Sequence, residues 1–69
     1  MRNVLIYPGE DGFWVAEVPS LPGCISQGET REEALTNVKD AIRLYIEVLQ
    51  EDGLPIPDDY PPHTELIAV

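Results

Sequence analysis

Short apolar stretches separated by turn residues fill the first 28 positions of the chain. Val4 to Tyr7 is apolar, and Phe13 to Val18 is rich in the aromatic and β-branched residues that favour strands. Cys24 to Gln27 forms a third short stretch. Proline and glycine, which favour turns, separate the three stretches, in Pro8–Gly12 and in Pro19–Gly23. The pattern therefore predicts an antiparallel meander of strands at about residues 3–7, 13–18 and 24–27.

Beyond these stretches the hydrophobic period becomes helical. Apolar residues recur at the spacing of one helix face, at Ala34, Leu35, Val38, Ala41, Ile42, Tyr45 and Leu49. Thr30 and Glu33 form a T-x-x-E capping box, and Gly53 marks the end of the pattern. The sequence thus predicts a helix at about residues 31–52. Leu44 falls near the edge of the polar face, so the apolar stripe does not assign it to the core.

The C-terminal part of the chain divides into two segments. Residues 54–62 are rich in proline, so we expect them to be extended. Residues 64–69 are mostly apolar and predict a fourth strand, which commonly lies parallel to its partner after a helix crossover. The expected fold is α+β with the order β-β-β-α-β and the long helix on one sheet face. At this length, residues 1–69 form a single domain.

The second strand presents two different faces, because alternate residues of a strand point to opposite sides of the sheet. We assign one set, which includes Trp14 and Ala16, to the core beneath the helix. The other set is Phe13, Val15 and Glu17, on the open face. The first strand is apolar on both sides, and one helix covers only one of them. We therefore expect the open face to bind protein, with these three residues as partner contacts.

The excess of acidic over basic residues indicates which kinds of molecule the chain can bind. Thirteen acidic residues face four basic ones, which gives a formal net charge of −9. Binding of nucleic acid depends on Lys and Arg neutralising phosphates, so we expect no direct contact with DNA or RNA. A basic protein partner is favoured by charge complementarity, although acidity also serves solubility. The basic residues are scattered along the chain, at Arg2, Arg31, Lys39 and Arg43.

The size of the chain also bears on its assembly and its location. A domain this small buries only about 60% of the surface that its unfolded chain exposes. Oligomerisation is a natural source of further stability, so we expect a homo-oligomer, dimer or higher. The sequence shows no basic, apolar signal at its N-terminus and no long apolar run. We expect a cytoplasmic protein that makes no contact with a membrane.

The residue types that carry chemistry in enzymes are too few here to form a site. The one cysteine, Cys24, needs a base such as histidine to act as a nucleophile, and the one histidine, His63, lies far along the chain. Asp58 and Asp59 are adjacent in an extended segment, so their carboxylates point apart and need further ligands to hold a metal. We therefore expect no catalytic residue, no metal site, no cofactor and no enzymatic activity.

Residues from the second strand to the helix form a combination that is typical of one known family: Ala16–Pro19, Leu21–Cys24, Gly28–Thr30, Glu33–Ala34, Asn37 and Ala41. In these residues the chain resembles the HicB family, the antitoxin half of HicA/HicB toxin–antitoxin systems. The resemblance implies a degenerate ribonuclease H-like topology. Nucleases of that architecture need clustered carboxylates for divalent metal, one of them from the first strand, and Val4 to Tyr7 contains no acid.

The resemblance implies a function without catalysis. A HicB-like antitoxin binds a small basic HicA-type toxin, an RNA-cleaving protein with a double-stranded-RNA-binding-domain fold. It neutralises the toxin sterically, by covering its catalytic histidine or its RNA-binding surface. Many family members also carry a C-terminal DNA-binding domain, whereas this sequence ends at Val69, so we expect no binding to an operator.

Two hypotheses follow for the role of the chain. In the first, it neutralises a HicA-type toxin. In the second, it is an orphan homo-oligomeric module with no toxin partner and no catalytic activity. Copies would then associate through a free sheet edge, through the open sheet face or around Leu44.

Overall fold

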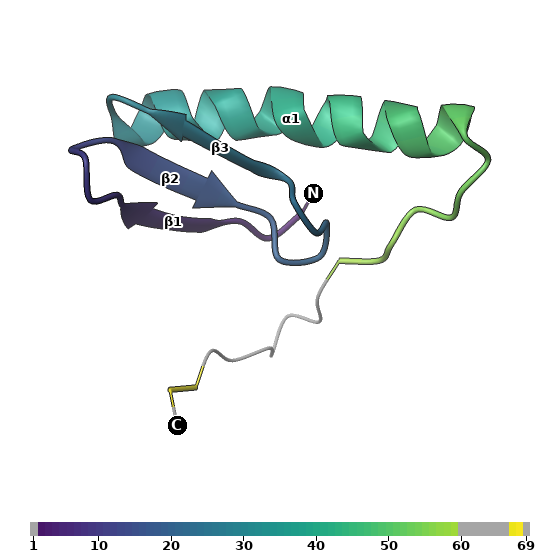
Figure 1. Cartoon of the computed structure of the whole chain (residues 1–69), viewed down its shortest axis with the longest axis horizontal. Helices are drawn as coiled ribbons and strands as arrows, with labels where there is room; N and C mark the ends of the chain where they lie inside the picture. The colour runs from purple at the N-terminus through teal and green to yellow at the C-terminus, as the bar shows by residue number, and fades with distance from the viewer. Residues whose placement is uncertain (1, 60–66, 69) are drawn as a thin grey trace.

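Three strands and one helix make up the described part of the chain, which in this computed structural model comprises residues 2–59 and 67–68. The elements are β1 (Leu5–Pro8), β2 (Trp14–Glu17), β3 (Ile25–Gly28) and α1 (Arg31–Glu51). The sheet order is β1-β2-β3, and each neighbouring pair is antiparallel. Helix α1 covers one face of the sheet (Figure 1). The predicted α+β class, with three antiparallel strands followed by one long helix, is confirmed.

The predicted fourth strand, at residues 64–69, lies mostly outside the described residues. Of that range the structure describes Ile67 and Ala68, which belong to no strand. The proline-rich segment has neither helix nor strand over residues 54–59. After α1 this segment runs back toward the sheet (Figure 1). The complete β-β-β-α-β order and the single-domain organisation stay predictions.

The turn between β1 and β2 follows from its Asp-Gly sequence. Asp11 Oδ1 accepts a hydrogen bond from the Phe13 backbone N–H at 3.2 Å. Gly12 has a φ of 85°, a left-handed conformation that glycine adopts without a Cβ clash. Gly9 N–H then donates to the Phe13 carbonyl at 2.6 Å and closes the turn. Local chemistry therefore sets the register of the first hairpin.

The core lies between β2, the β2–β3 loop and the first half of α1. The predicted placement of Trp14 and Ala16 beneath the helix is confirmed, since Ala16 is fully buried and Trp14 packs against the same cluster. Leu21 is fully buried as well, although it belongs to the Pro/Gly loop rather than to a strand. The buried hydrophobic residues are Ala16, Val18, Leu21, Cys24, Ala34 and Val38.

The junction between β3 and α1 is fixed by a close backbone approach and a helix cap. A Cβ added at Gly28 would lie 2.5 Å from the Ala34 nitrogen, so glycine lets the strand end touch the first helical turn. Thr30 Oγ1 accepts from the Glu33 N–H at 3.0 Å, and Glu33 Oε1 accepts from the Glu29 N–H at 3.1 Å. The predicted N-terminal cap is confirmed.

Among the described residues no further strand pairs with either edge of the sheet, and both edges are partly blunted. Val18 N–H donates to the Cys24 carbonyl at 3.0 Å, so Val18 and Cys24 form a hydrogen-bonded pair of the ladder between β2 and β3. Hydrogen-bonded and non-hydrogen-bonded pairs alternate in an antiparallel ladder, so Gln27, which pairs with Val15, directs its backbone N–H and C=O away from β2. The Gln27 carbonyl accepts a hydrogen bond there from Asn37 Nδ2 at 2.8 Å. On the other edge, Pro8 of β1 has no N–H to offer. Both features disfavour the addition of another strand to the sheet.

Candidate partner-binding surfaces

The open face of the sheet, opposite α1, carries side chains from all three strands. The register places Tyr7 beside Val15, and Val15 beside Gln27. Because alternate residues share a face, the pairing defines a set of six. This open face comprises Leu5, Tyr7, Val15, Glu17, Ile25 and Gln27. It combines aliphatic, aromatic, amide and carboxylate groups, which suits contact with another protein.

The structure places the three predicted contact residues close together along the chain but not in one element. Val15 and Glu17 belong to β2, the central strand, and both are half-buried. Phe13 immediately precedes β2, at the end of the turn, and is also half-buried. Val15 and Glu17 therefore share the open face, and the contact role of all three residues stays a proposal.

A hydrogen bond joins β1 and β2 across this face. The Tyr7 hydroxyl donates to Glu17 Oε2 at 3.1 Å. This bond, followed by desolvation and the charge of Glu17, raises the pKa of Tyr7 above its ordinary value of 10.0. The phenol therefore stays protonated as a donor through the neutral range, and the carboxylate of Glu17 keeps a fixed position on the open face.

The structure contains a second apolar surface that the sequence pattern indicated only through Leu44. We call it the helix groove, an open groove of about 550 Å³ along the second half of α1. Leu44 and Val48 are each 54% exposed. Leu54 borders the groove from the segment after the helix and is 53% exposed. The groove is lined by Gly23, Cys24, Ile25, Ala41, Leu44, Tyr45, Val48, Leu49, Asp52 and Leu54.

The helix groove exists because the helix is longer than the sheet that it covers. A helix of the length of α1, 21 residues, spans about 31 Å, whereas a four-residue strand spans about 13 Å. The second half of α1 accordingly extends past the sheet (Figure 1). One hydrogen bond ties this half to the loop before β3, from the Tyr45 hydroxyl to the Pro22 carbonyl at 2.8 Å.

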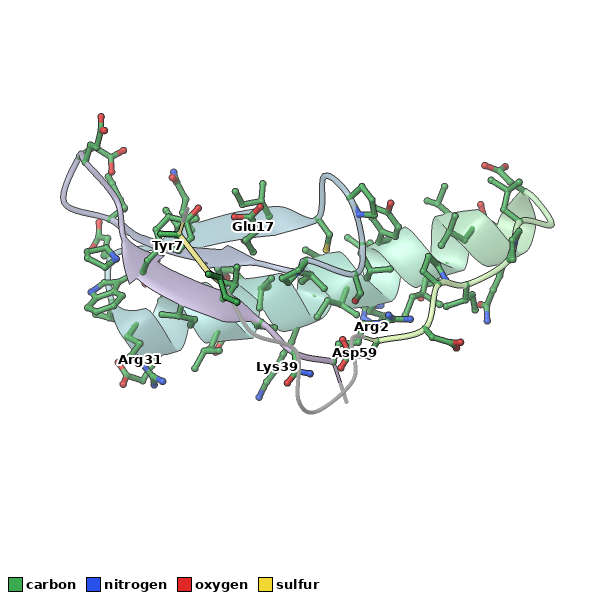
Figure 2. The ribbon with its side chains drawn as sticks, turned by 90° about the horizontal axis from the view of Figure 1, so that it is seen from below. Arg2, Tyr7, Glu17, Arg31, Lys39 and Asp59 are labelled. Carbon is green, nitrogen blue, oxygen red and sulfur yellow. The ribbon has the colours of Figure 1, made fainter. Side chains whose placement is uncertain are left out.

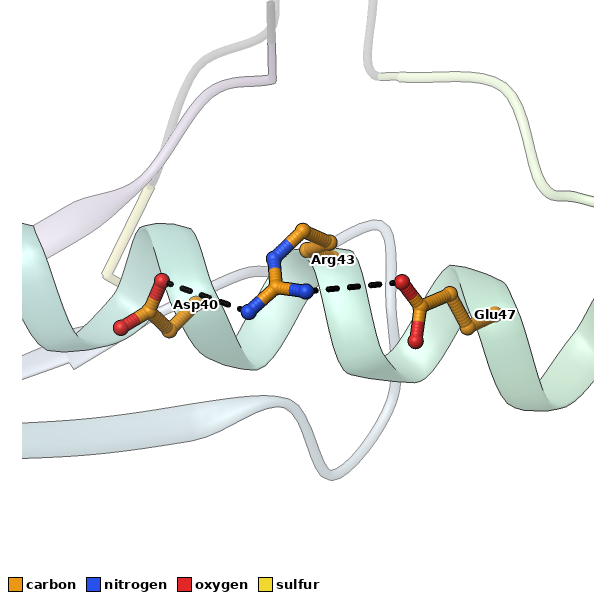
Figure 3. Close-up of polar contacts among 3 residues, drawn as sticks. All are labelled: Asp40, Arg43 and Glu47. Carbon is orange, nitrogen blue, oxygen red and sulfur yellow. Dashed lines mark ion pairs between the residues drawn. The ribbon is translucent and has the colours of Figure 1, made fainter.

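Acidic side chains follow the second half of the helix. Between residues 40 and 52 the sequence has four acidic side chains and one basic side chain, Arg43. Arg43 contacts Asp40 at 3.8 Å and Glu47 at 3.5 Å, and all three side chains are more than half exposed (Figure 3). Exposed pairs of this kind contribute little to stability, but they compensate the one positive charge in this part of the helix.

The described basic residues do not form a nucleic-acid-binding patch. Arg31 and Lys39 project from different turns of α1, and Arg2 lies elsewhere, beside Asp59 (Figure 2). Arg2 donates to Ser20 Oγ at 3.1 Å and to the Pro57 carbonyl at 2.5 Å. Its charge is thus used within the fold.

A polar clasp connects the N-terminus, the β2–β3 loop and the segment after the helix. Asp59 accepts hydrogen bonds from the Asn3 backbone N–H at 2.9 Å and from Ser20 Oγ at 3.3 Å. Ser20 is buried, and Arg2 donates to the same hydroxyl. Asp59, considered in the sequence as part of a metal site, acts here as a structural acceptor. No pattern in the sequence indicated that these segments meet.

One reactive side chain in the described part of the chain, the thiol of Cys24, lies in the core. Cys24 is buried, and desolvation raises the pKa of its thiol despite the opposing charge of Arg2. A thiol in this state is a weak nucleophile. Within residues 2–59 and 67–68 no three His, Cys, Asp or Glu residues gather to hold a metal ion. His63 lies outside the described residues.

Within the same described ranges, no helix is both long enough and apolar enough to cross a bilayer. Helix α1 has sufficient length, but it carries charged residues on nearly every turn. Its polar side faces water and its apolar side faces the sheet and the helix groove.

Comparison with known proteins identifies relatives along most of the chain. A family model described as HicB_like antitoxin of bacterial toxin-antitoxin system matches residues 3–67. A UPF0150 protein of Thermoplasma acidophilum is 54% identical over 57 residues, which cover 83% of this chain and 83% of the relative. A UPF0150 protein of Archaeoglobus fulgidus is 48% identical over 52 residues, covering 72% and 75%.

One relative has a name that states a role. The protein named Antitoxin HicB 1 of Photorhabdus laumondii is 39% identical over 54 residues. These residues cover 78% of this chain but only 35% of that protein. The similarity to it therefore concerns one part of a longer molecule.

Proposed function

The chain belongs to the HicB-like antitoxin family of bacterial toxin–antitoxin systems, and from this premise we propose that it binds and neutralises a small basic HicA-type toxin that cleaves RNA. Family membership is the observation that carries the proposal. The net charge of −9 supports it, since an acidic protein associates faster with a basic partner and discriminates against acidic ones.

We place the toxin contact on the open face of the sheet. Phe13, Val15 and Glu17 are its proposed contacts, and all three are partly accessible. Val15 would supply apolar packing at the centre of the sheet, and Glu17 would face Lys or Arg of the toxin. The hydrogen bond from Tyr7 holds the Glu17 carboxylate in place before the partner arrives, which lowers the entropy lost on binding.

Neutralisation on this model is steric and requires no chemistry from the antitoxin. A bound chain would cover the catalytic histidine of the toxin or the surface that holds RNA. The buried, protonated thiol of Cys24 takes no part in it. We accordingly assign the chain a non-enzymatic role in the cytoplasm, where the toxin and its RNA substrates meet.

The test asks whether a reading frame beside the one for this chain encodes a small basic protein, and uses that protein. Its expression alone should arrest growth, and co-expression of the wild-type chain should restore it. Val15→Glu places a second carboxylate on the apolar centre of the open face and should weaken binding at least about tenfold. Gln50→Glu is the matched control, because it adds the same charge at an exposed helix position and should leave binding unchanged.

Two results would contradict the proposal. If the wild-type chain neither binds the basic protein nor restores growth, this chain is not its antitoxin. If Val15→Glu folds normally by circular dichroism and still binds as tightly as the wild type, the toxin does not dock on the open face. Repeating the binding measurement at high salt adds a check, since an interface between opposite charges weakens as salt screens it.

A second candidate function is an orphan homo-oligomeric module. The exposed apolar residues of the open face favour it, in particular Tyr7 and Ile25, because such surfaces are commonly covered by another protein. A chain that forms a stable oligomer by light scattering, and for which no neighbouring basic protein proves toxic, would support this function over the antitoxin.

A further inference from the structure

Apolar residues of α1 that are not buried in the core line the helix groove. Leu44 and Val48 are each 54% exposed, on the same helix whose Ala34 and Val38 are fully buried. Cys24, Tyr45 and Leu54 also line the groove. An apolar groove between a helix and neighbouring loops is a common place for an amphipathic segment to bind.

The surroundings of the helix groove are acidic. Helix neighbours lie three and four positions apart, which places Asp40 and Glu47 beside Leu44. The same spacing places Glu51 and Asp52 beside Val48, and Asp52 lines the groove itself. Arg43 forms ion pairs with Asp40 and Glu47 (Figure 3). The groove is therefore lined mainly by apolar residues and bordered by negatively charged ones.

Helix stability does not account for Glu51 and Asp52, the acids at the C-terminal end of α1. The last turn of α1 contains no basic residue, and the C-terminal end of a helix carries a partial negative charge that disfavours carboxylates. At the other end of the helix, Glu32 and Glu33 lie where the dipole favours them. A positively charged partner at the second half of α1 would make its acids favourable.

The acidic residues around the helix groove also make a second copy of the chain an unfavourable partner for it. In a symmetric dimer the same patch lies on both sides of the interface. Pairing the groove with itself would bring Glu47, Glu51 and Asp52 of one copy toward those of the other. Like charges in an interface are unfavourable, whereas a basic segment would pair with them.

We propose that the helix groove, which shares Ile25 with the open face, receives an amphipathic, basic helix of the same toxin. The apolar residues of that helix lie against Leu44 and Val48, and its Lys or Arg residues lie against Glu51 and Asp52. The inference rests on the proposed function, since it takes the toxin as the partner. From Ala41 to Asp52 the groove follows three turns of α1, which suits apolar anchors at positions i, i+3 or i+4, and i+7.

The experiment measures the affinity of the full chain for the toxin, inactivated at its catalytic histidine, by titration calorimetry at low and high salt. Leu44→Gln combined with Val48→Gln removes the apolar contacts and should weaken binding at least about tenfold. Glu51→Gln combined with Asp52→Asn should weaken binding at low salt and reduce its salt dependence. Gln50→Glu, on the opposite side of the helix, should bind like the wild type.

The outcomes separate this inference from the proposed function. If the wild-type chain does not bind the toxin, both are overturned. If the wild type binds and the Leu44→Gln, Val48→Gln variant binds equally well, the antitoxin function stands and the groove proposal is wrong. If that variant keeps its toxin affinity but loses self-association by light scattering, the groove holds a second copy, and the proposal is again wrong.

Discussion

The two halves of α1 have similar apolar spacing but different environments. In the first half Ala34 and Val38 are fully buried against the sheet. In the second half Leu44 and Val48 are more than half exposed, along the helix groove. The difference arises because the strands end before the helix does (Figure 1). The core therefore uses the apolar stripe of the first half, whereas Leu44 and Val48 lie beside that stripe and line the helix groove.

The two ends of α1 also differ in how well their charged residues suit the helix dipole. The first turn is capped by Thr30 and carries Glu32 and Glu33, which agree with the helix dipole. The last turn carries Glu51 and no basic residue, which opposes the dipole. Local interactions stabilise the half that packs on the sheet, whereas the overhanging half keeps charges that helix stability alone would not favour.

The largest expected effect is at the junction that joins the first half of α1 to the sheet. Gly28→Ala would place a Cβ 2.5 Å from the Ala34 nitrogen and 2.8 Å from the Glu33 carbonyl carbon. Backbone atoms move less easily than side chains, so we expect the free energy of unfolding to fall by about 3 kcal/mol. Chemical denaturation of the purified variant measures this change.

Gly53→Ala, just past the other end of the helix, is the comparison. A Cβ there meets no atom within 4 Å, and the strain comes only from a φ of 67°. We expect a loss of about 1 kcal/mol. Equal losses at Gly28 and Gly53 would show that the strand–helix junction is no tighter than the free end of the helix.

A matched pair of valines tests the two halves directly. Val38 is fully buried and Val48 is 54% exposed, ten positions apart on α1. Val38→Ala removes buried methyl groups and leaves a small cavity, so it should lower the free energy of unfolding by about 2 kcal/mol. Val48→Ala should change it by less than about 0.5 kcal/mol, because alanine has the higher helix propensity.

The measurement for both valine variants is thermal unfolding followed by circular dichroism, at several protein concentrations. A large loss for Val48→Ala in the monomer would mean that the second half of the helix packs against the chain itself. A loss that appears only at high concentration would instead indicate that Val48 is covered by another copy.

A smaller effect is expected from reversing a charge at the end of the overhanging half. Glu51→Lys places a cation in the last turn, where the helix dipole favours it, and should raise the free energy of unfolding by about 0.3–1 kcal/mol. The same change should weaken binding of a basic toxin. A variant that is more stable and also binds more tightly would contradict the role of these acids in recognition.

The smallest effect concerns the open face of the sheet. The pKa of Tyr7 is raised in the folded chain by its hydrogen bond to Glu17, so this contact contributes stability below pH 10. That contribution is lost as the pH rises through the folded pKa. Glu17→Gln should lower the pKa of Tyr7 toward 10.0, as measured by NMR titration of its ring. An unchanged pKa would show that the hydrogen bond does not persist in solution.

Local signals in the sequence were sufficient to predict the three described strands and the helix. Aromatic and β-branched residues indicated the strands, Asp11 and Gly12 the first turn, and Thr30 with Glu33 the helix start, because each acts through near neighbours in the chain. Leu21 shows the limit of this reasoning. It lies in a Pro/Gly loop with no periodic pattern, yet it is fully buried in the core.

The candidate sites were predictable only in part. Strand alternation placed Val15 and Glu17 on one face before the structure was known, since side chains alternate with a period of two. The sequence did not indicate the partnership of Tyr7 with Glu17, which depends on the register between β1 and β2. It did not indicate the clasp of Arg2 and Ser20 with Asp59 either, because these residues come from segments far apart in the chain.

The sequence by itself determined the α+β class, the capped helix, the acidic charge and the resemblance to HicB antitoxins, since all of these depend on local order and composition. The tertiary structure alone decided which half of α1 is buried and which half lines the helix groove. A helical stripe records only which residues share a face. Whether that face packs against a sheet or contacts solvent depends on how far the helix extends past the strands. That overhang exists only in the folded chain.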